Sequence, residues 1–225
     1  EKFMSYFQAF SNTYKPVEEL EKIYIESLCR SDIVGISIGT RPDCVDNDKL
    51  NLISSFTKDY YTWIEYGLQS VHDSTLKKIN RGHDYRIFLE AYEKAKNRNI
   101  NVCLHVILNL FETYEEMMQT AKTIAELEPD GVKLHMLCAL KGTKLAQMYE
   151  NGAIVFMSEE EYVNTVCDFL EYLPPETTIH RLAGNGLRTE LIAPRWIGKK
   201  LDCLNKIDRE LFRRNSYQSI LYSKK

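Results

Sequence analysis

The chain alternates short apolar, β-branched runs with segments whose apolar residues recur at helical spacing. The run IVGISIGT at 33–40 is continuous enough for a strand buried on both faces, and Leu50, Ile53 and Phe56 after it have the spacing of a helix. Strict alternation of strands and helices requires parallel strands with right-handed crossovers. The fold is therefore an α/β barrel or a doubly wound sheet.

The same alternation runs along most of the chain. Pro16 suits a helix start, and Thr113 with Glu116 and Ser158 with Glu161 form capping-box patterns that begin helices at 114–127 and 159–172. Two further helices are expected to open at Asp73 and Asp84, and further strands are expected at 3–10, 61–66, 101–110, 131–137 and 177–183.

No strand is followed by a Rossmann glycine fingerprint or a phosphate-binding loop, which favours the barrel. We expect a barrel domain at 1–183 and a basic C-terminal extension, largely helical, at 184–225. In a barrel, catalytic groups gather at the C-terminal ends of the strands.

Composition limits the other function classes. No apolar run approaches the ~20 residues that cross a bilayer, and no signal-like segment opens the chain, so a cytoplasmic protein is expected. The six cysteines occur singly, without a C-x-x-C pair, which is typical of reduced structural thiols. A self-contained zinc site is not expected.

Charge is distributed unevenly. Residues 180–225 hold 11 Lys and Arg against 4 Asp and Glu, whereas the rest of the chain holds 18 against 28. A basic segment of this kind fits a surface that meets an anionic partner such as RNA, and it equally fits a solvated amphipathic helix.

Polar residues recur where the expected strands end. Glu65, Lys133 and Arg41 are costly to bury unless they pair with one another or bind a ligand, and His105 and His135 are either hydrogen-bonded core residues or functional groups. Gly39, Gly67 and Gly82 are turn glycines or points of close backbone approach to a cofactor. The whole polar set comprises Gln8, Asn12, Thr40, Arg41, Glu65, Gln69, His105, Asn109, Lys133, His135, His180 and Arg181.

Five segments together resemble a known family: YFQAFSNTY, GISIGTRPDC, WIEYGLQSVHDSTLKKINRGHD, NVCLHVIL and GVKLHMLCALKGTKLAQMY. They are similar to the YhcC-like iron-sulfur oxidoreductases of the radical S-adenosylmethionine (SAM) superfamily, which are related to the elongator catalytic subunit. The similarity covers nearly the whole chain, and 63–84 is its most specific block.

The resemblance implies a partial (β/α)6 TIM-like barrel that here lacks its first strand. Because the chain enters a strand directly after Glu1 and Lys2, we expect a fragment whose three cluster cysteines lie ahead of Glu1. Such a fragment would not bind the [4Fe-4S] cluster and would be inactive, and it would self-associate through its exposed sheet edge.

The resemblance also assigns cofactor-binding positions. Gln69, Arg81 and His105 match positions that contact SAM, Gly39 replaces an acidic residue common in relatives, and Gln8 falls near the strand that meets the methionine moiety. After the fourth strand the sequence reads Asn-Leu-Phe-Glu at 109–112, one residue shorter than the superfamily's usual Gly-Leu-Pro-Gly-Glu. The candidate substrate-binding residues are Arg41, Glu65, Lys133, His135, His180 and Arg181.

The expected activity is reductive cleavage of SAM followed by hydrogen abstraction from a substrate, for which tRNA or another RNA is a candidate. Two alternatives remain at this point. One is a metal-dependent barrel hydrolase using His105, His135 and Glu65, and the other is a noncatalytic RNA-binding module that uses the basic tail.

Overall fold

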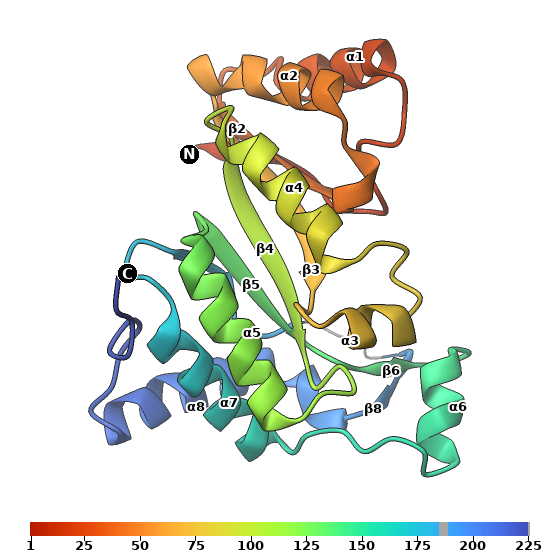
Figure 1. The fold of residues 1–225 in the computed structure, drawn as a ribbon, viewed down its shortest axis with the longest axis vertical. Coiled ribbons are helices and arrows are strands. Elements are labelled where there is room, and N and C mark those ends of the chain that lie inside the picture. The colour runs from red at the N-terminus through yellow and green to blue at the C-terminus, as the bar shows by residue number, and fades with distance from the viewer. Residues whose placement is uncertain (185–188, 225) are drawn as a thin grey trace. The chain divides into compact units, whose positions relative to one another are not determined.

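The computed structural model describes residues 1–184 and 189–224 (Figure 1). The chain divides into two compact units, one formed by 1–105 with 129–131 and the other by 106–128 with 132–225. None of the helices in the described residues has the length and hydropathy needed to cross a membrane.

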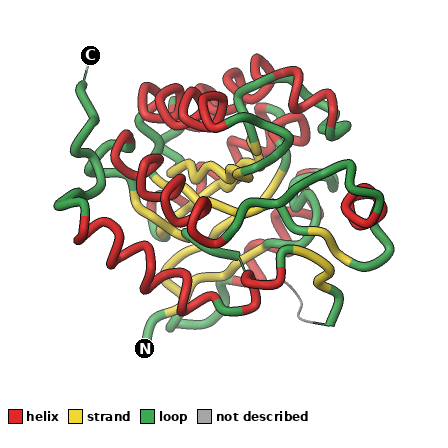
Figure 2. The backbone as a smooth tube through the Cα atoms, turned by 90° about the horizontal axis from the view of Figure 1, so that it is seen from below, coloured by secondary structure: helices red, strands yellow, loops and turns green. Residues whose placement is uncertain are grey.

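The first unit follows the expected alternation of strands and helices. Its elements are β1 (Phe3–Phe7), α1 (Val17–Ser27), β2 (Ile33–Thr40), α2 (Asn47–Ser55), β3 (Tyr61–Gln69), α3 (Asp73–Lys78), α4 (Tyr85–Lys96) and most of β4 (Asn101–Leu108), with 3-10 turns at Pro42–Cys44 and Phe56–Lys58. The strands β1, β2 and β3 pair in parallel. Figure 2 shows the strands of the chain in yellow and its helices in red.

The second unit is richer in helix. Its elements are α5 (Tyr114–Leu127), β5 (Gly131–Met136), β6 (Ala139–Leu140), α6 (Lys144–Glu150), α7 (Glu159–Tyr172), β7 (Thr178–Arg181), β8 (Leu191–Ala193), a 3-10 turn at Arg195–Gly198 and α8 (Lys200–Arg213). The short strands β6 and β8 form a separate antiparallel pair.

The main sheet has the strand order β1-β2-β3-β4-β5-β7, so its strands follow one another in chain order, with only β6 of the separate pair intervening between β5 and β7. This order confirms the predicted α/β class and is the order of a partial (β/α)6 barrel, with α8 as the helical element at the C-terminal end. The boundary expected at 183/184 stays a prediction, and residues 185–188 and 225 of the expected extension lie outside the described residues.

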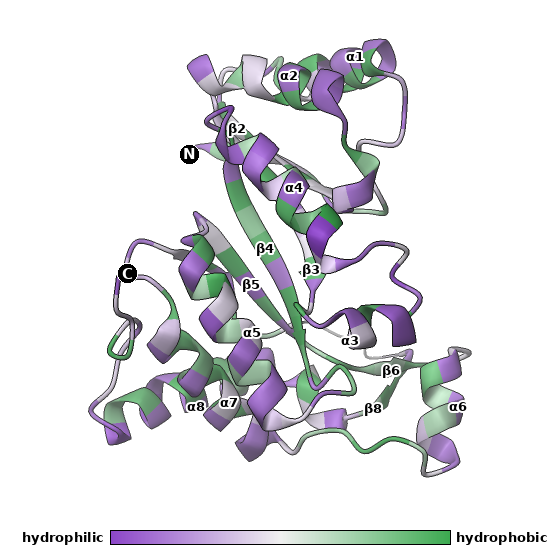
Figure 3. Ribbon diagram, in the orientation of Figure 1, coloured by the Kyte–Doolittle hydropathy of each residue, from purple (hydrophilic) through white to green (hydrophobic). Residues whose placement is uncertain are grey.

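The two faces of β2 and β3 have different chemistry. Ile36 and Ile38 of β2 and Ile64 and Tyr66 of β3 are fully buried, and the Tyr66 ring packs edge-on against Phe88 of α4. Because side chains alternate along a strand, the other face carries the polar residues between them. Figure 3 shows β4 as largely green, whereas β5 has both green and purple bands.

Local signals set the helix starts. The predicted capping boxes are present at both α5 and α7, and Asp84 accepts the Ile87 N–H at 2.8 Å to cap α4. Strand ends were harder to place, because β1 ends at Phe7 and β4 at Leu108, both before residues with a positive φ, namely Phe10 (63°) and Asn109 (63°).

Candidate functional site

A polar cavity of about 380 Å³ lies in the first unit, where β1, β2 and β3 end. Seven predicted site residues line it: Gln8, Gly39, Arg41, Glu65, Gln69, Arg81 and His105. Its other lining residues are Phe10, Ser11, Thr40 and Gly67. The expectation that strand ends would deliver polar groups to one place therefore holds for this unit.

Glu65 is the most buried ionisable group of the cavity. Its side chain is 2% exposed, and it accepts hydrogen bonds from Ser37 Oγ at 2.6 Å and Tyr6 OH at 3.0 Å. His105 Nε2 lies 2.8 Å from the second carboxylate oxygen. Four neighbouring strands thus each contribute one side chain to this cluster, which offsets the cost of burying the carboxylate.

Arg81 follows α3 and reaches back to the end of β3. Its Nε and Nη2 atoms donate to the Gly67 carbonyl oxygen at 3.1 and 2.5 Å, and Nε also lies 3.1 Å from His83 Nε2. No carboxylate of the described residues lies within ion-pair distance of this guanidinium. Burial lowers the pKa of Arg81, and the nearby positive charge of Arg41 lowers it further.

Gln69 adds an acceptor beside this guanidinium. It is the last residue of β3 and has a φ of 73°, and its Oε1 atom is buried without a hydrogen-bond partner in the described part of the chain. A Cβ atom at Gly67 would lie 2.3 Å from Arg81 Nη2 and 2.8 Å from Gln69 Nε2. Glycine at position 67 is therefore what allows both side chains to occupy this end of the cavity.

Arg41 forms another wall, but its charge is already paired. Its Nε donates to Asp43 at 2.9 Å, and hydrogen bonding to Asp43 raises the pKa of Arg41. A Cβ atom at Gly82 would lie 2.7 Å from Arg41 Nη2. Arg41 is thus held in place by its own loop and is less available to an anion than Arg81.

The loop after β1 is fastened to β2. Asn12 Nδ2 donates to the Gly39 and Phe7 carbonyl oxygens at 2.8 and 3.0 Å, and Thr13 Oγ1 lies 2.6 Å from Thr40 Oγ1. These bonds fix the wall of the cavity that contains Gly39.

Four predicted residues belong to the second unit and do not line this cavity. Lys133, which is buried, and His135 lie on β5, whereas His180 and Arg181 lie on β7. Their assignment to a substrate site stays a prediction. Sequence reasoning missed Tyr6 and Ser37, although both occupy the alternate strand positions that face the polar side.

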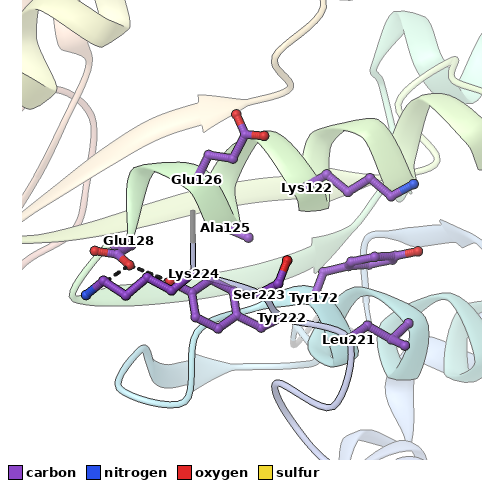
Figure 4. Close-up of a pocket in the computed structure, with 9 residues that line it drawn as sticks. All are labelled: Lys122, Ala125, Glu126, Glu128, Tyr172, Leu221, Tyr222, Ser223 and Lys224. Carbon is purple, nitrogen blue, oxygen red and sulfur yellow. Dashed lines mark hydrogen bonds and ion pairs between the residues drawn. The ribbon is translucent and has the colours of Figure 1, made fainter.

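A second cavity, of about 410 Å³, lies in the second unit beside α5, α7 and the C-terminal segment (Figure 4). Glu128 pairs there with Tyr222 OH and with Lys224 at 3.6 Å, and Lys122 lies 5.0 Å from the centre of the Tyr172 ring. Because its charged groups contact other groups of the chain, this cavity gives no indication of a ligand.

The described residues contain no group of three or more His, Cys, Asp and Glu side chains that could hold a metal ion. The six cysteines are all free thiols. Burial raises the pKa of Cys167 to about 12 and of Cys203 to about 11, which keeps both protonated and poor as ligands. These residues do not fit an iron-sulfur cluster, whose ligands are thiolates.

Comparison with known protein families identifies the family of the chain. The family model described as the Radical SAM superfamily matches residues 2–124, which include every residue that lines the polar cavity. The chain belongs to the radical SAM superfamily. The radical SAM C-terminal domain matches residues 129–213.

Several proteins of this superfamily are similar over most of the chain. The uncharacterized protein YtqA of Bacillus subtilis is 42% identical over 224 residues, which are 99% of this chain and 70% of YtqA. Protein YhcC of Escherichia coli is 35% identical over 212 residues, 93% of this chain and 69% of YhcC. Human elongator complex protein 3 is 29% identical over 181 residues, 76% of this chain and 30% of that protein. The predicted kinship with the YhcC-like radical SAM proteins is thus confirmed.

Solved structures agree on the fold. The archaeal Elp3 of Methanocaldococcus infernus matches with a TM-score of 0.81 at 18% identity, covering 96% of this chain and 55% of that one. The chain therefore spans little more than half of this solved relative. The likeness confirms the partial barrel of radical SAM enzymes.

Proposed function

We propose that the protein containing this chain is a radical SAM enzyme that cleaves SAM reductively and abstracts hydrogen from a substrate. The observation that carries the proposal is that Arg81 and Gln69 both lie beside Gly67 at one end of the polar cavity. A desolvated guanidinium without a carboxylate partner suits the carboxylate of SAM, and the unpartnered Gln69 Oε1 suits an ammonium or hydroxyl donor.

Other features of the cavity support the same ligand. Its volume of about 380 Å³ is within the usual range for small-molecule sites, and Gly39 and Gly67 leave space where side chains would otherwise intrude. Gln8, directly after β1, and His105, on β4, complete the wall. When bound, SAM supplies the radical chemistry, while the residues of this chain bind and orient it and exclude water.

A [4Fe-4S] cluster belongs to the proposal for the whole protein. Because the described residues lack its ligands, we derive no step through it from this chain. The substrate is also part of the proposal. RNA, including tRNA, is supported by the similarity to elongator complex protein 3 and by the basic residues of 180–225. A cytoplasmic location, where thiolates stay reduced, fits these cofactors.

The first test measures SAM binding to Arg81→Gln. We expect the dissociation constant to rise about tenfold to a hundredfold, since a charge-assisted hydrogen bond to the carboxylate is lost. Arg86→Gln is the matched control, because Arg86 is an exposed arginine on α4 whose partner is Glu90. Equal SAM affinity of Arg81→Gln and the wild type would remove the basis of the proposed site.

The second test uses the natural full-length protein, purified without oxygen. We expect about four irons per chain and release of deoxyadenosine on reduction. An iron-free protein that binds no SAM would contradict the proposed activity.

A further inference from the structure

Glu65 and His105 contact each other, but their side chains differ in how far they are exposed to the cavity. The carboxylate is 2% exposed, whereas the His105 imidazole that it contacts is 20% exposed and lines the cavity. A ligand in the cavity would therefore meet the imidazole before the carboxylate. Glu65 can influence a ligand chiefly through His105.

The donor geometry determines how the imidazole is held. An ionised carboxylate can only accept hydrogen bonds, and Glu65 takes them from two hydroxyl groups, Ser37 on Oε1 and Tyr6 on Oε2. At 2.8 Å from the same Oε2, His105 Nε2 must then carry the proton. In a neutral imidazole this leaves Nδ1 as the acceptor nitrogen.

We propose that Glu65 is a positioning residue: it holds His105 in one orientation, as the Nε2–H tautomer, and so fixes which imidazole face the cavity presents to its ligand. Ser37 and Tyr6 hold the carboxylate from β2 and β1, so the imidazole is anchored to three neighbouring strands. The tautomer follows from this chain's own contacts, and only its link to SAM rests on the proposed function.

The tautomer can be measured on the 225-residue chain without any cofactor. Nitrogen-15 labelling of the five histidines, with His105→Asn to assign the signal, reports which ring nitrogen of His105 is protonated. We expect the proton on Nε2, with slow exchange against solvent. A proton on Nδ1 in the wild-type chain would overturn the proposal, and this measurement needs no variant that could fail to fold.

Glu65→Gln tests the cause of the tautomer. The carboxamide keeps the size of the side chain but can no longer accept through both oxygens, so we expect ring-proton exchange about tenfold faster and a mixture of tautomers. Ser37→Ala is the matched control, because it removes a bond to the carboxylate but leaves the imidazole contact. Unchanged exchange and tautomer in Glu65→Gln would contradict the positioning role.

The link to the cofactor has its own readout. We expect Glu65→Gln and His105→Asn each to weaken SAM binding about tenfold and the double variant to weaken it no further, because both remove one presented group. If the losses of SAM affinity in the two single variants add up in the double variant, the proposed link between Glu65, His105 and SAM is wrong. A wild-type chain that has the Nε2–H tautomer but binds no SAM would instead contradict the proposed function and leave the positioning role standing.

Discussion

Gly67 and Gly35 lie on neighbouring strands, and the absence of a side chain has a different structural role at each position. At Gly67, the atoms that a Cβ would meet are the ends of the Arg81 and Gln69 side chains, which can move. At Gly35, the nearest atom is the Tyr61 carbonyl oxygen at 2.5 Å, which is backbone of the paired strand β3. The first glycine therefore shapes the cavity, and the second allows β2 and β3 to pair.

Gly67→Ala should impair binding more than folding. The added methyl group displaces Arg81 and Gln69, so we expect SAM affinity to fall about tenfold, while the free energy of unfolding changes by less than ~1 kcal/mol. Isothermal titration and urea unfolding measure the two effects. A variant that lost stability but bound SAM normally would contradict this account.

Gly35→Ala should destabilise the first unit by ~2 kcal/mol, because the strand must shift or the ladder must break. The measurement is the midpoint of urea unfolding at constant slope. Gly184→Ala is the control, since among the described residues its Cβ would meet no atom closer than 3.9 Å. Equal stability of the two variants would contradict this prediction. It would show that β3 can shift to accommodate the methyl group at little cost in free energy.

At the scale of the element, the parts with local signals were predictable. Thr113 and Ser158 mark helix starts because a cap depends on residues only three positions apart. The last third was harder to predict: α8 buries few residues, among them Cys203 and Ile207, and the two- and three-residue strands β6 and β8 are too short for a periodicity. Their pairing is a long-range contact that no local pattern encodes.

The end of α8 carries an ionic network that also escapes local patterns. Glu210 accepts from Arg213 at 2.7 Å and from Arg214 Nε at 2.6 Å, and Arg214 also contacts Asp168 of α7 at 2.5 Å. Hydrogen bonds from these two arginines lower the pKa of Glu210 from 4.5 to about 2. Arg214 therefore joins the end of α8 to α7 through Asp168, while Glu210 holds Arg214 from α8.

Glu210→Gln should destabilise the protein at pH 7 by up to ~1 kcal/mol, the scale of ion pairs near the surface. Because the folded-state pKa is depressed, the contribution is complete above about 4.5 and is lost as the pH falls toward 2. Urea unfolding of variant and wild type at several pH values should show the difference shrinking over this window. A difference independent of pH would mean that packing, not charge, is what the substitution removes.

At the scale of the whole molecule, the order of the strands followed from the chain's alternation, since parallel strands joined by helices tend to be neighbours in the sheet. The gathering of Gln69, Arg81 and His105 at one cavity followed from the strand-end rule together with the family resemblance. Tyr6 and Ser37 were missed because an aromatic and a small hydroxyl residue fit an ordinary strand equally well. Only their contacts to Glu65 in the structure give them a role.

The same strand order exposes a sheet edge at β1, the first strand in the order. Phe3 and Met4 on this strand are 47% and 42% exposed. An edge strand with exposed apolar side chains pairs readily with another chain. We therefore expect the 225-residue chain to self-associate between about 1 and 100 µM, as measured by sedimentation velocity.

Phe3→Lys should suppress this association, because a charge on an edge strand opposes pairing. Ile25→Lys is the matched control: Ile25 is also exposed, at 55%, but lies on the helix α1 and not on the edge strand. If both substitutions suppress association equally, the net charge of the chain controls the association, and pairing at the edge of β1 does not. If the wild-type chain stays monomeric across the whole range, the exposed residues of β1 are not an association surface, and the edge is protected by its short length of five residues.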